Sequence, residues 1–97
     1  MENLNASLNG FPVWLQYKPL ALGIEKQVFQ HIARHRLSGS KRIVQRLLRQ
    51  HTRDERYLRN LFDDTARFNL DGTEAGVVTD ADQIHAGMMI AAKHSGR

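Results

Sequence analysis

The feature of this chain that most limits its fold is a set of apolar residues spaced for helices between residues 24 and 62. In three successive segments, apolar side chains recur every three or four residues, which places them on one helical face. Their members are Ile24, Val28, Phe29, Ile32 and Ala33, then Ile43, Val44, Leu47 and Leu48, then Tyr57, Leu58, Leu61 and Phe62. The spacing predicts three helices packed around a common core.

The ends of these helices carry recognisable signals. Leu37-Ser-Gly-Ser40 is typical of a turn, and Ser40 is a good N-cap for the second helix. Thr52 is followed three residues later by Glu55, the spacing of a capping box. We therefore expect helices over residues 24–35 and 41–51, with a third helix beginning at Thr52.

The last third of the chain predicts a β-hairpin and one more helix. Phe68 and Leu70 alternate with polar residues, and Asp71-Gly72 is a two-residue hairpin signal. A return strand over residues 74–78 follows, with Gly76 as its weak point. Thr79 then caps a helix over residues 80–93. Its expected inward residues are Ala81, Ile84, Met88, Ala91 and Ala92, with His85 beside them.

These elements define an α+β fold that is mainly helical, with four to five helices and one β-hairpin. The 97 residues suit one domain with one modest core. We expect a flexible N-terminal segment over residues 1–10, a domain over residues 11–93 and a tail over residues 94–97.

The charge of the chain is unevenly distributed. The formal net charge is +4, but residues 34–59 alone carry +7 and the rest of the chain −3. Eight of the nine basic residues in that segment are arginines, which bind phosphate bidentately and stack on bases. A basic surface that contacts a polyanion is therefore expected, rather than a merely solvated helix face.

Other classes of function find less support in the sequence. There is no cysteine, so disulfides and cysteine-based zinc sites are excluded. His31 and His35 have the spacing of two zinc ligands, but no HExxH pattern accompanies them. We expect no metal, no cofactor, no small-molecule substrate and no catalytic residues. Without a signal peptide or a membrane-spanning run, a soluble cytoplasmic protein is expected. We also expect it to be a monomer.

Four short blocks resemble one protein family. They are Lys18-Pro-Leu-Ala-Leu-Gly-Ile24, Leu48-Arg-Gln-His-Thr52 followed by Tyr57-Leu58, Arg67-Phe-Asn-Leu-Asp-Gly72, and His85-Ala86. In this order they are similar to the motifs of the ProQ/FinO domain, a group of bacterial RNA chaperones, and this chain resembles the minimal domain alone. Gln45 departs from the pattern, because the family commonly has an arginine there. The turn before Lys41 is also one residue longer than in the best-known member of that family.

The resemblance implies an RNA-binding protein that recognises small RNAs and messenger RNA 3′ regions in post-transcriptional regulation. Its preferred ligand is a terminator-like hairpin with a single-stranded 3′ tail. The implied RNA-binding residues are Lys41, Arg42, Gln45, Arg46, Arg49, Tyr57 and Arg67. The 3′ end is expected at a helix N-terminus formed by Leu22, Gly23 and Ile24, whose free N–H groups attract phosphate.

Two alternatives remain open from the residues themselves. A helix, a short turn and an arginine-rich helix also fit a helix-turn-helix protein that binds DNA. The other alternative is a protein-interaction module without affinity for nucleic acid. A DNA reader would prefer duplex DNA, whereas the RNA hypothesis requires a hairpin with a free 3′ end.

Overall fold

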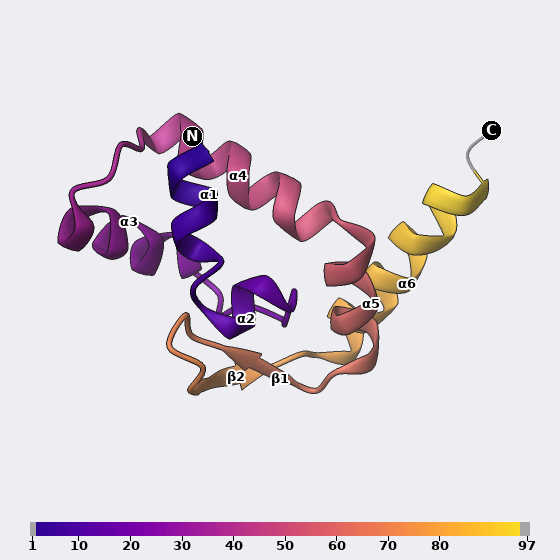
Figure 1. Cartoon of the computed structure of the whole chain (residues 1–97). Helices are drawn as coiled ribbons and strands as arrows, with labels where there is room; N and C mark the ends of the chain where they lie inside the picture. The colour runs from indigo at the N-terminus through magenta and orange to yellow at the C-terminus, as the bar shows by residue number, and fades with distance from the viewer. Residues whose placement is uncertain (1, 96–97) are drawn as a thin grey trace.

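The computed structural model describes residues 2–95 and confirms a mainly helical α+β fold with one β-hairpin (Figure 1). Its elements are α1 (Glu2–Leu8), α2 (Pro12–Leu15), α3 (Ile24–His35), α4 (Lys41–Arg53), α5 (Glu55–Asp63), β1 (Ala66–Phe68), β2 (Glu74–Val77) and α6 (Asp80–Ser95). The described residues thus form six helices rather than four to five, because the N-terminal segment adds α1 and the short α2.

The expectation of a flexible segment over residues 1–10 is wrong for residues 2–8, which form α1. Leu4 and Leu8, four residues apart, are both fully buried and belong to the hydrophobic core. Polar residues of α1 are also used, since Asn5 accepts a hydrogen bond from Trp14 at 3.2 Å. Two leucines in a polar stretch were too weak a signal for a helix, although their spacing is helical. Residue 1 lies outside the described residues.

The joint between α4 and α5 lies two residues later than predicted. The N-cap of α5 is Asp54, whose carboxylate accepts a hydrogen bond from the Arg56 N–H at 2.9 Å. Thr52 remains inside α4, where its hydroxyl donates to the Leu48 carbonyl oxygen at 2.9 Å. A threonine bonded back along the helix cannot cap the next one. At the other end of α4, the Ser40 cap is confirmed by its bond to the Ile43 N–H at 3.2 Å.

The hairpin is joined by a three-residue loop, not the two-residue loop that Asp71-Gly72 predicted. The Asn69 N–H donates to the Thr73 carbonyl oxygen at 2.9 Å and encloses residues 70–72. Gly72 has a φ of 91°, the left-handed conformation that this loop requires. Arg67 pairs with Gly76, but Phe68 pairs with Glu74, so β2 bulges at Ala75.

The inward face of α6 also differs from the prediction. Ala86 is fully buried, and the ring of Phe62 packs against Gly87. Ile84 and Met88 are instead 62% and 67% exposed, and Ala81, His85, Ala91 and Ala92 are exposed too. This helix is apolar on most sides, so periodicity alone did not decide which side faces the core. The tail expected over residues 94–97 is helical up to Ser95, and the last two residues lie outside the described part.

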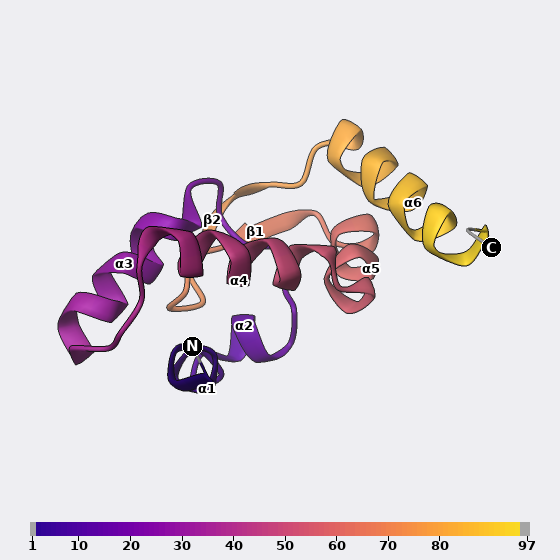
Figure 2. The ribbon, with the colours of Figure 1, turned by 90° about the horizontal axis from the view of Figure 1, so that it is seen from above.

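Helix α4 runs across the middle of the molecule and is covered on its apolar side. In Figure 1, α2 and the hairpin both lie below α4, and Figure 2 shows the hairpin crossing behind α4. Helix α6 packs mainly against α5 and points away from the rest of the fold. The core contacts of α4 come from Val44, Leu47 and His51. Across residues 2–95, no helix has the length and apolarity that crossing a membrane demands.

Candidate nucleic-acid interface

The outer side of α4 carries an arginine stripe, formed by Arg42, Arg46, Arg49 and Arg53. The steps of four, three and four residues keep these side chains within one narrow sector of the helix. The buried residues Val44, Leu47 and His51 lie on the opposite side. All four arginines are exposed, so their guanidinium groups face solvent together.

Lys41 and Gln45 lie beside the arginine stripe and are also exposed. The structure therefore brings together five of the predicted residues, namely Lys41, Arg42, Gln45, Arg46 and Arg49. Arg53 was not among the predicted site residues, because the helix was expected to end near His51. Once α4 is known to reach Arg53, the same spacing rule assigns that residue to the stripe.

The two acidic residues nearest in sequence are already paired with other cations. Asp54 accepts hydrogen bonds from the Arg56 guanidinium at 2.9 Å, which lowers the pKa of Asp54 to about 2. Glu55 accepts a hydrogen bond from Arg59 at 2.7 Å and another from His94 at 3.0 Å. Among residues 2–95, no carboxylate forms an ion pair with the arginine stripe. The stripe keeps its full charge for an external anion.

The start of α3 is open, as a phosphate-binding helix terminus requires. Gly23 is the N-cap with a φ of 75°, and no side chain caps the helix. A Cβ atom built at Gly23 would meet no heavy atom within 4 Å, so the backbone there is accessible. Leu22 is 82% exposed, whereas the side chain of Ile24 is buried. Of the three predicted residues, Leu22 and Gly23 face solvent and Ile24 anchors the helix.

Tyr57 and Arg67 meet beneath this helix start, around the peptide groups of Leu20. The Tyr57 hydroxyl accepts a hydrogen bond from the Leu20 N–H at 3.2 Å. Arg67 donates to the Leu20 carbonyl oxygen at 2.8 Å and to the Asp82 carboxylate at 2.9 Å. Tyr57 is only 5% exposed and Arg67 only 8%. The Tyr57 hydroxyl and both terminal amino groups of Arg67 are engaged inside the protein, while the buried Arg67 Nε has no partner among the described residues. In this arrangement the two side chains brace the chain that leads into α3.

Asp82 links this brace to α6. Its carboxylate accepts from the Thr79 N–H at 3.1 Å, and the Thr79 hydroxyl accepts from the Asp82 N–H at 3.1 Å. The predicted cap of the last helix at Thr79 is thereby confirmed. The hydrogen bond from Arg67 is the largest cause that lowers the pKa of Asp82, which stabilises the charged carboxylate.

His51 lies at the centre of an aromatic stack that the sequence analysis did not anticipate. Its ring stacks on Trp14 at 3.7 Å and on Tyr17 at 4.3 Å between centroids. The Arg56 guanidinium then covers the Tyr17 ring at 4.3 Å. His51 is 6% exposed, and burial lowers its pKa to about 4. This stack fixes the inner side of α4.

The other histidines give no metal centre. The rings of His31 and His35 lie 4.5 Å apart between centroids, and the His31 ring exchanges a 2.7 Å hydrogen bond with the Ser7 hydroxyl. Within the described part of the chain, no cluster of three or more histidine, aspartate or glutamate residues is placed to hold a metal ion.

Comparison with known proteins places this chain in a family. The family model described as the ProQ/FINO family matches residues 2–97. Among solved structures, a FinO-like RNA chaperone from Neisseria meningitidis MC58 superposes with a TM-score of 0.82 and 27% sequence identity. The match covers 99% of this chain and 78% of that one. No curated protein matches the sequence significantly. Because the family model spans almost the whole chain, this protein belongs to the ProQ/FinO family.

Proposed function

We propose that this chain binds structured RNA and acts as an RNA chaperone, without catalysing a reaction. The observation that carries the proposal is the arginine stripe, whose four guanidinium groups have no carboxylate partner among the described residues. Membership of the ProQ/FinO family supports it, as does the likeness to a FinO-like RNA chaperone. The ligands proposed for this chain are small RNAs and messenger RNA 3′ regions in the cytoplasm. Its proposed role is post-transcriptional regulation.

The arginine stripe suits the backbone of an RNA duplex. From Arg42 to Arg53 the helix rises by about 16 Å, which extends the charge along several phosphates. Arginine holds phosphate oxygens through a planar fork of N–H donors. A-form RNA hides its base edges in a deep, narrow groove, so this surface reads phosphates and helix shape. Gln45 adds a hydrogen-bonding group to the same surface without adding charge.

The 3′ end of the RNA binds at the start of α3. The Ile24 and Lys26 N–H groups donate to the Ala21 and Gly23 carbonyl oxygens at 3.1 Å, whereas those of Gly23 and Glu25 have no described acceptor. These two N–H groups and the open space at Gly23 favour a terminal phosphate or hydroxyl. The exposed Leu22 offers apolar contact to an unpaired base. Tyr57 and Arg67 contribute by holding Leu20 in place, so that the three residues Leu22, Gly23 and Ile24 keep their conformation.

A gel-shift experiment with three ligands tests this function. We expect the tightest binding to an RNA hairpin with a free single-stranded 3′ tail. Blocking the 3′ hydroxyl should weaken binding, and a DNA duplex of the same length should bind less tightly still. Preference for the DNA duplex would favour the helix-turn-helix alternative. If none of the three ligands shows salt-sensitive binding, the result would favour the alternative of a protein-interaction module.

A further inference from the structure

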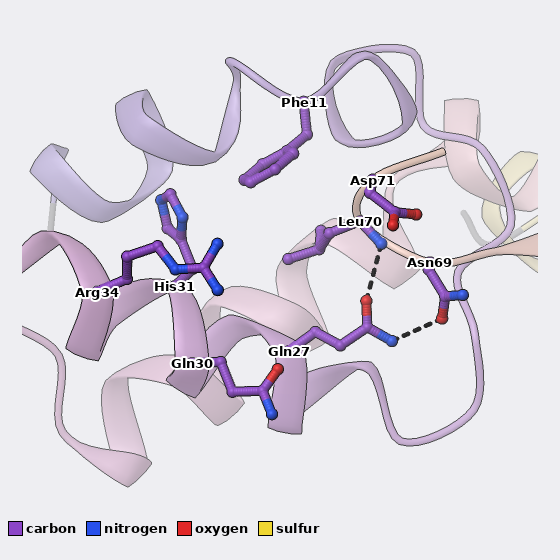
Figure 3. A pocket seen from close by; sticks show the side chains of 8 residues that line it. All are labelled: Phe11, Gln27, Gln30, His31, Arg34, Asn69, Leu70 and Asp71. Atoms are coloured by element: carbon purple, nitrogen blue, oxygen red, sulfur yellow. Dashed lines mark hydrogen bonds between the residues drawn. The ribbon is translucent and has the colours of Figure 1, made fainter. Parts of the chain in front are cut away.

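A cavity of about 380 Å³ lies between α3, the loop after α1 and the tip of the hairpin. It is lined by Phe11, Gln27, Gln30, His31, Arg34, Asn69, Leu70 and Asp71 (Figure 3). None of these residues belongs to the arginine stripe or to the helix start at Leu22, Gly23 and Ile24. The volume lies at the lower end of the range for small-molecule pockets, so it suits a single compact ligand rather than a duplex.

The walls of this cavity are held in place by internal bonds. The Gln27 amide donates to the Asn69 side chain at 2.7 Å and accepts from the Leu70 N–H at 2.9 Å, which ties α3 to the hairpin tip. On the other side, the His31 ring is hydrogen-bonded to the Ser7 hydroxyl. It packs edge-on against the Phe11 ring, and the two ring centroids lie 5.0 Å apart. The cavity is therefore largely formed before any ligand arrives.

The charged side chains of this cavity, Arg34 and Asp71, lie at its opposite ends. Figure 3 shows Arg34 and His31 at one end, Asp71 and Asn69 at the other, and Phe11 along one side. Arg34 and Gln30 make no side-chain hydrogen bond or ion pair within residues 2–95. One carboxylate oxygen of Asp71 accepts from Thr73, which leaves the other without a described donor. The site thus offers a cation, an aromatic ring and an anionic acceptor in that order.

We infer that this cavity binds one unpaired nucleotide, with its phosphate at Arg34, its base against Phe11 and an exocyclic amino group at Asp71. Guanidinium binds phosphate, and aromatic rings stack on bases whatever their sequence. A carboxylate accepts hydrogen bonds from the amino group of cytosine, which uracil lacks. The inference rests on the proposed function where the nucleotide belongs to a bound RNA, but a free mononucleotide has the same chemistry.

Amide NMR of the full chain tests the cavity independently of the arginine stripe. Titration with CMP should shift the amide signals of Gln30, His31 and residues 69–72, and UMP should bind about three- to tenfold more weakly. Asp71→Asn keeps the turn acceptor for Thr73 and should remove the difference between the two nucleotides. Equal affinities in the original chain, or shifts confined to other residues, would overturn the assignment.

A second experiment tests whether the ligand of the cavity is a nucleotide of a bound RNA or a free nucleotide. Arg34→Ala should weaken binding of a hairpin with a 3′ tail about tenfold and leave a blunt hairpin unaffected. Lys93→Ala removes an exposed cation from the end of α6 and should change neither affinity. If Arg34→Ala weakens both RNAs equally, its charge acts non-specifically and the cavity is not an RNA site. If neither RNA binds the original chain, the proposed function fails, while the CMP titration still decides on the cavity.

Discussion

The arginine stripe and Arg67 carry the same kind of charge in opposite environments. On α4 the guanidinium groups are exposed and have no described carboxylate partner, while Arg67 is 8% exposed and bonded to Leu20 and Asp82. The stripe is available to a ligand at little cost to the fold. Arg67 holds Leu20 and Asp82 together inside the fold. Residue type alone therefore does not distinguish an exposed arginine without a carboxylate partner from one whose hydrogen bonds hold the fold together.

The largest effect is expected where a charge is placed on the inner side of α4. Val44 is fully buried, so Val44→Asp puts an unpaired carboxylate in the core and should abolish cooperative folding. Arg46→Asp changes the same helix on its outer side and should shift stability by no more than about 0.5 kcal/mol. Thermal melting followed by circular dichroism compares the two. A folded Val44→Asp variant would contradict the orientation of α4.

Arg67→Ala should be the most damaging of the arginine substitutions to stability. It removes the donor to the Leu20 carbonyl oxygen and leaves Asp82 without its cation. A loss of about 3 kcal/mol in the free energy of unfolding is expected, because one partner of a partly buried pair is removed. Denaturant unfolding measures this loss, with Arg49→Ala as the exposed control. Equal stabilities of the two variants would show that Arg67 is not a brace.

Acid should weaken the fold through His51. Its pKa of about 4 lies below the usual value because burial disfavours the charged ring, so the unfolded chain takes up the proton first. The contribution of neutral His51 to the free energy of unfolding is fully present above about pH 6.5. It falls by about 2 to 3 kcal/mol as the pH drops toward 4. Fluorescence of Trp14, the single tryptophan, can follow unfolding across this range.

His51→Phe is the matched control for this pH dependence. It keeps a ring between Trp14 and Tyr17 but cannot take up a proton. Most of the decline between pH 6.5 and 4 should disappear in this variant, and the part that stays belongs to His31, whose pKa burial also lowers. Asp54 does not interfere, because its pKa of about 2 makes its contribution fade only in more acidic solution. An unchanged pH profile would show that another group titrates in that range.

The smallest effect concerns Arg53, the residue that joins the stripe only because α4 is longer than predicted. Arg53→Ala should weaken binding of hairpin RNA by about tenfold and leave the melting temperature unchanged. Lys93→Ala, which removes one exposed cation from α6, should leave the affinity near its original value. Equal losses in the two variants would indicate that net charge, rather than the stripe, determines binding.

The sequence predicted the outer face of α4 well because helical spacing is a strong local signal. Lys41, Arg42, Arg46 and Arg49 share an exposed surface as expected. The same kind of reasoning was wrong for α6, where small and apolar residues occur all round the helix and leave its buried side undetermined. Only tertiary contacts with α5 decide that orientation.

The environments of Tyr57 and Arg67 could not be predicted from local sequence. Their shared partner, Leu20, lies 37 and 47 residues away along the chain. Neither periodicity nor a capping signal reports a contact at such a separation. The boundary error at Thr52 has a different origin, because the cap is Asp54, which accepts from the Arg56 N–H, while the Thr52 hydroxyl is bonded to the Leu48 carbonyl oxygen inside α4.

The salt dependence of RNA binding tests the central claim most directly. For the original chain, the logarithm of the binding constant for a tailed hairpin should fall as the logarithm of salt concentration rises, and the stripe arginines should contribute about −4 to the slope, one unit each. Replacing Arg42, Arg46, Arg49 and Arg53 together by alanine should make that slope about four units less steep while the fold melts as before. An unchanged slope in this folded variant would mean that RNA is held by another surface.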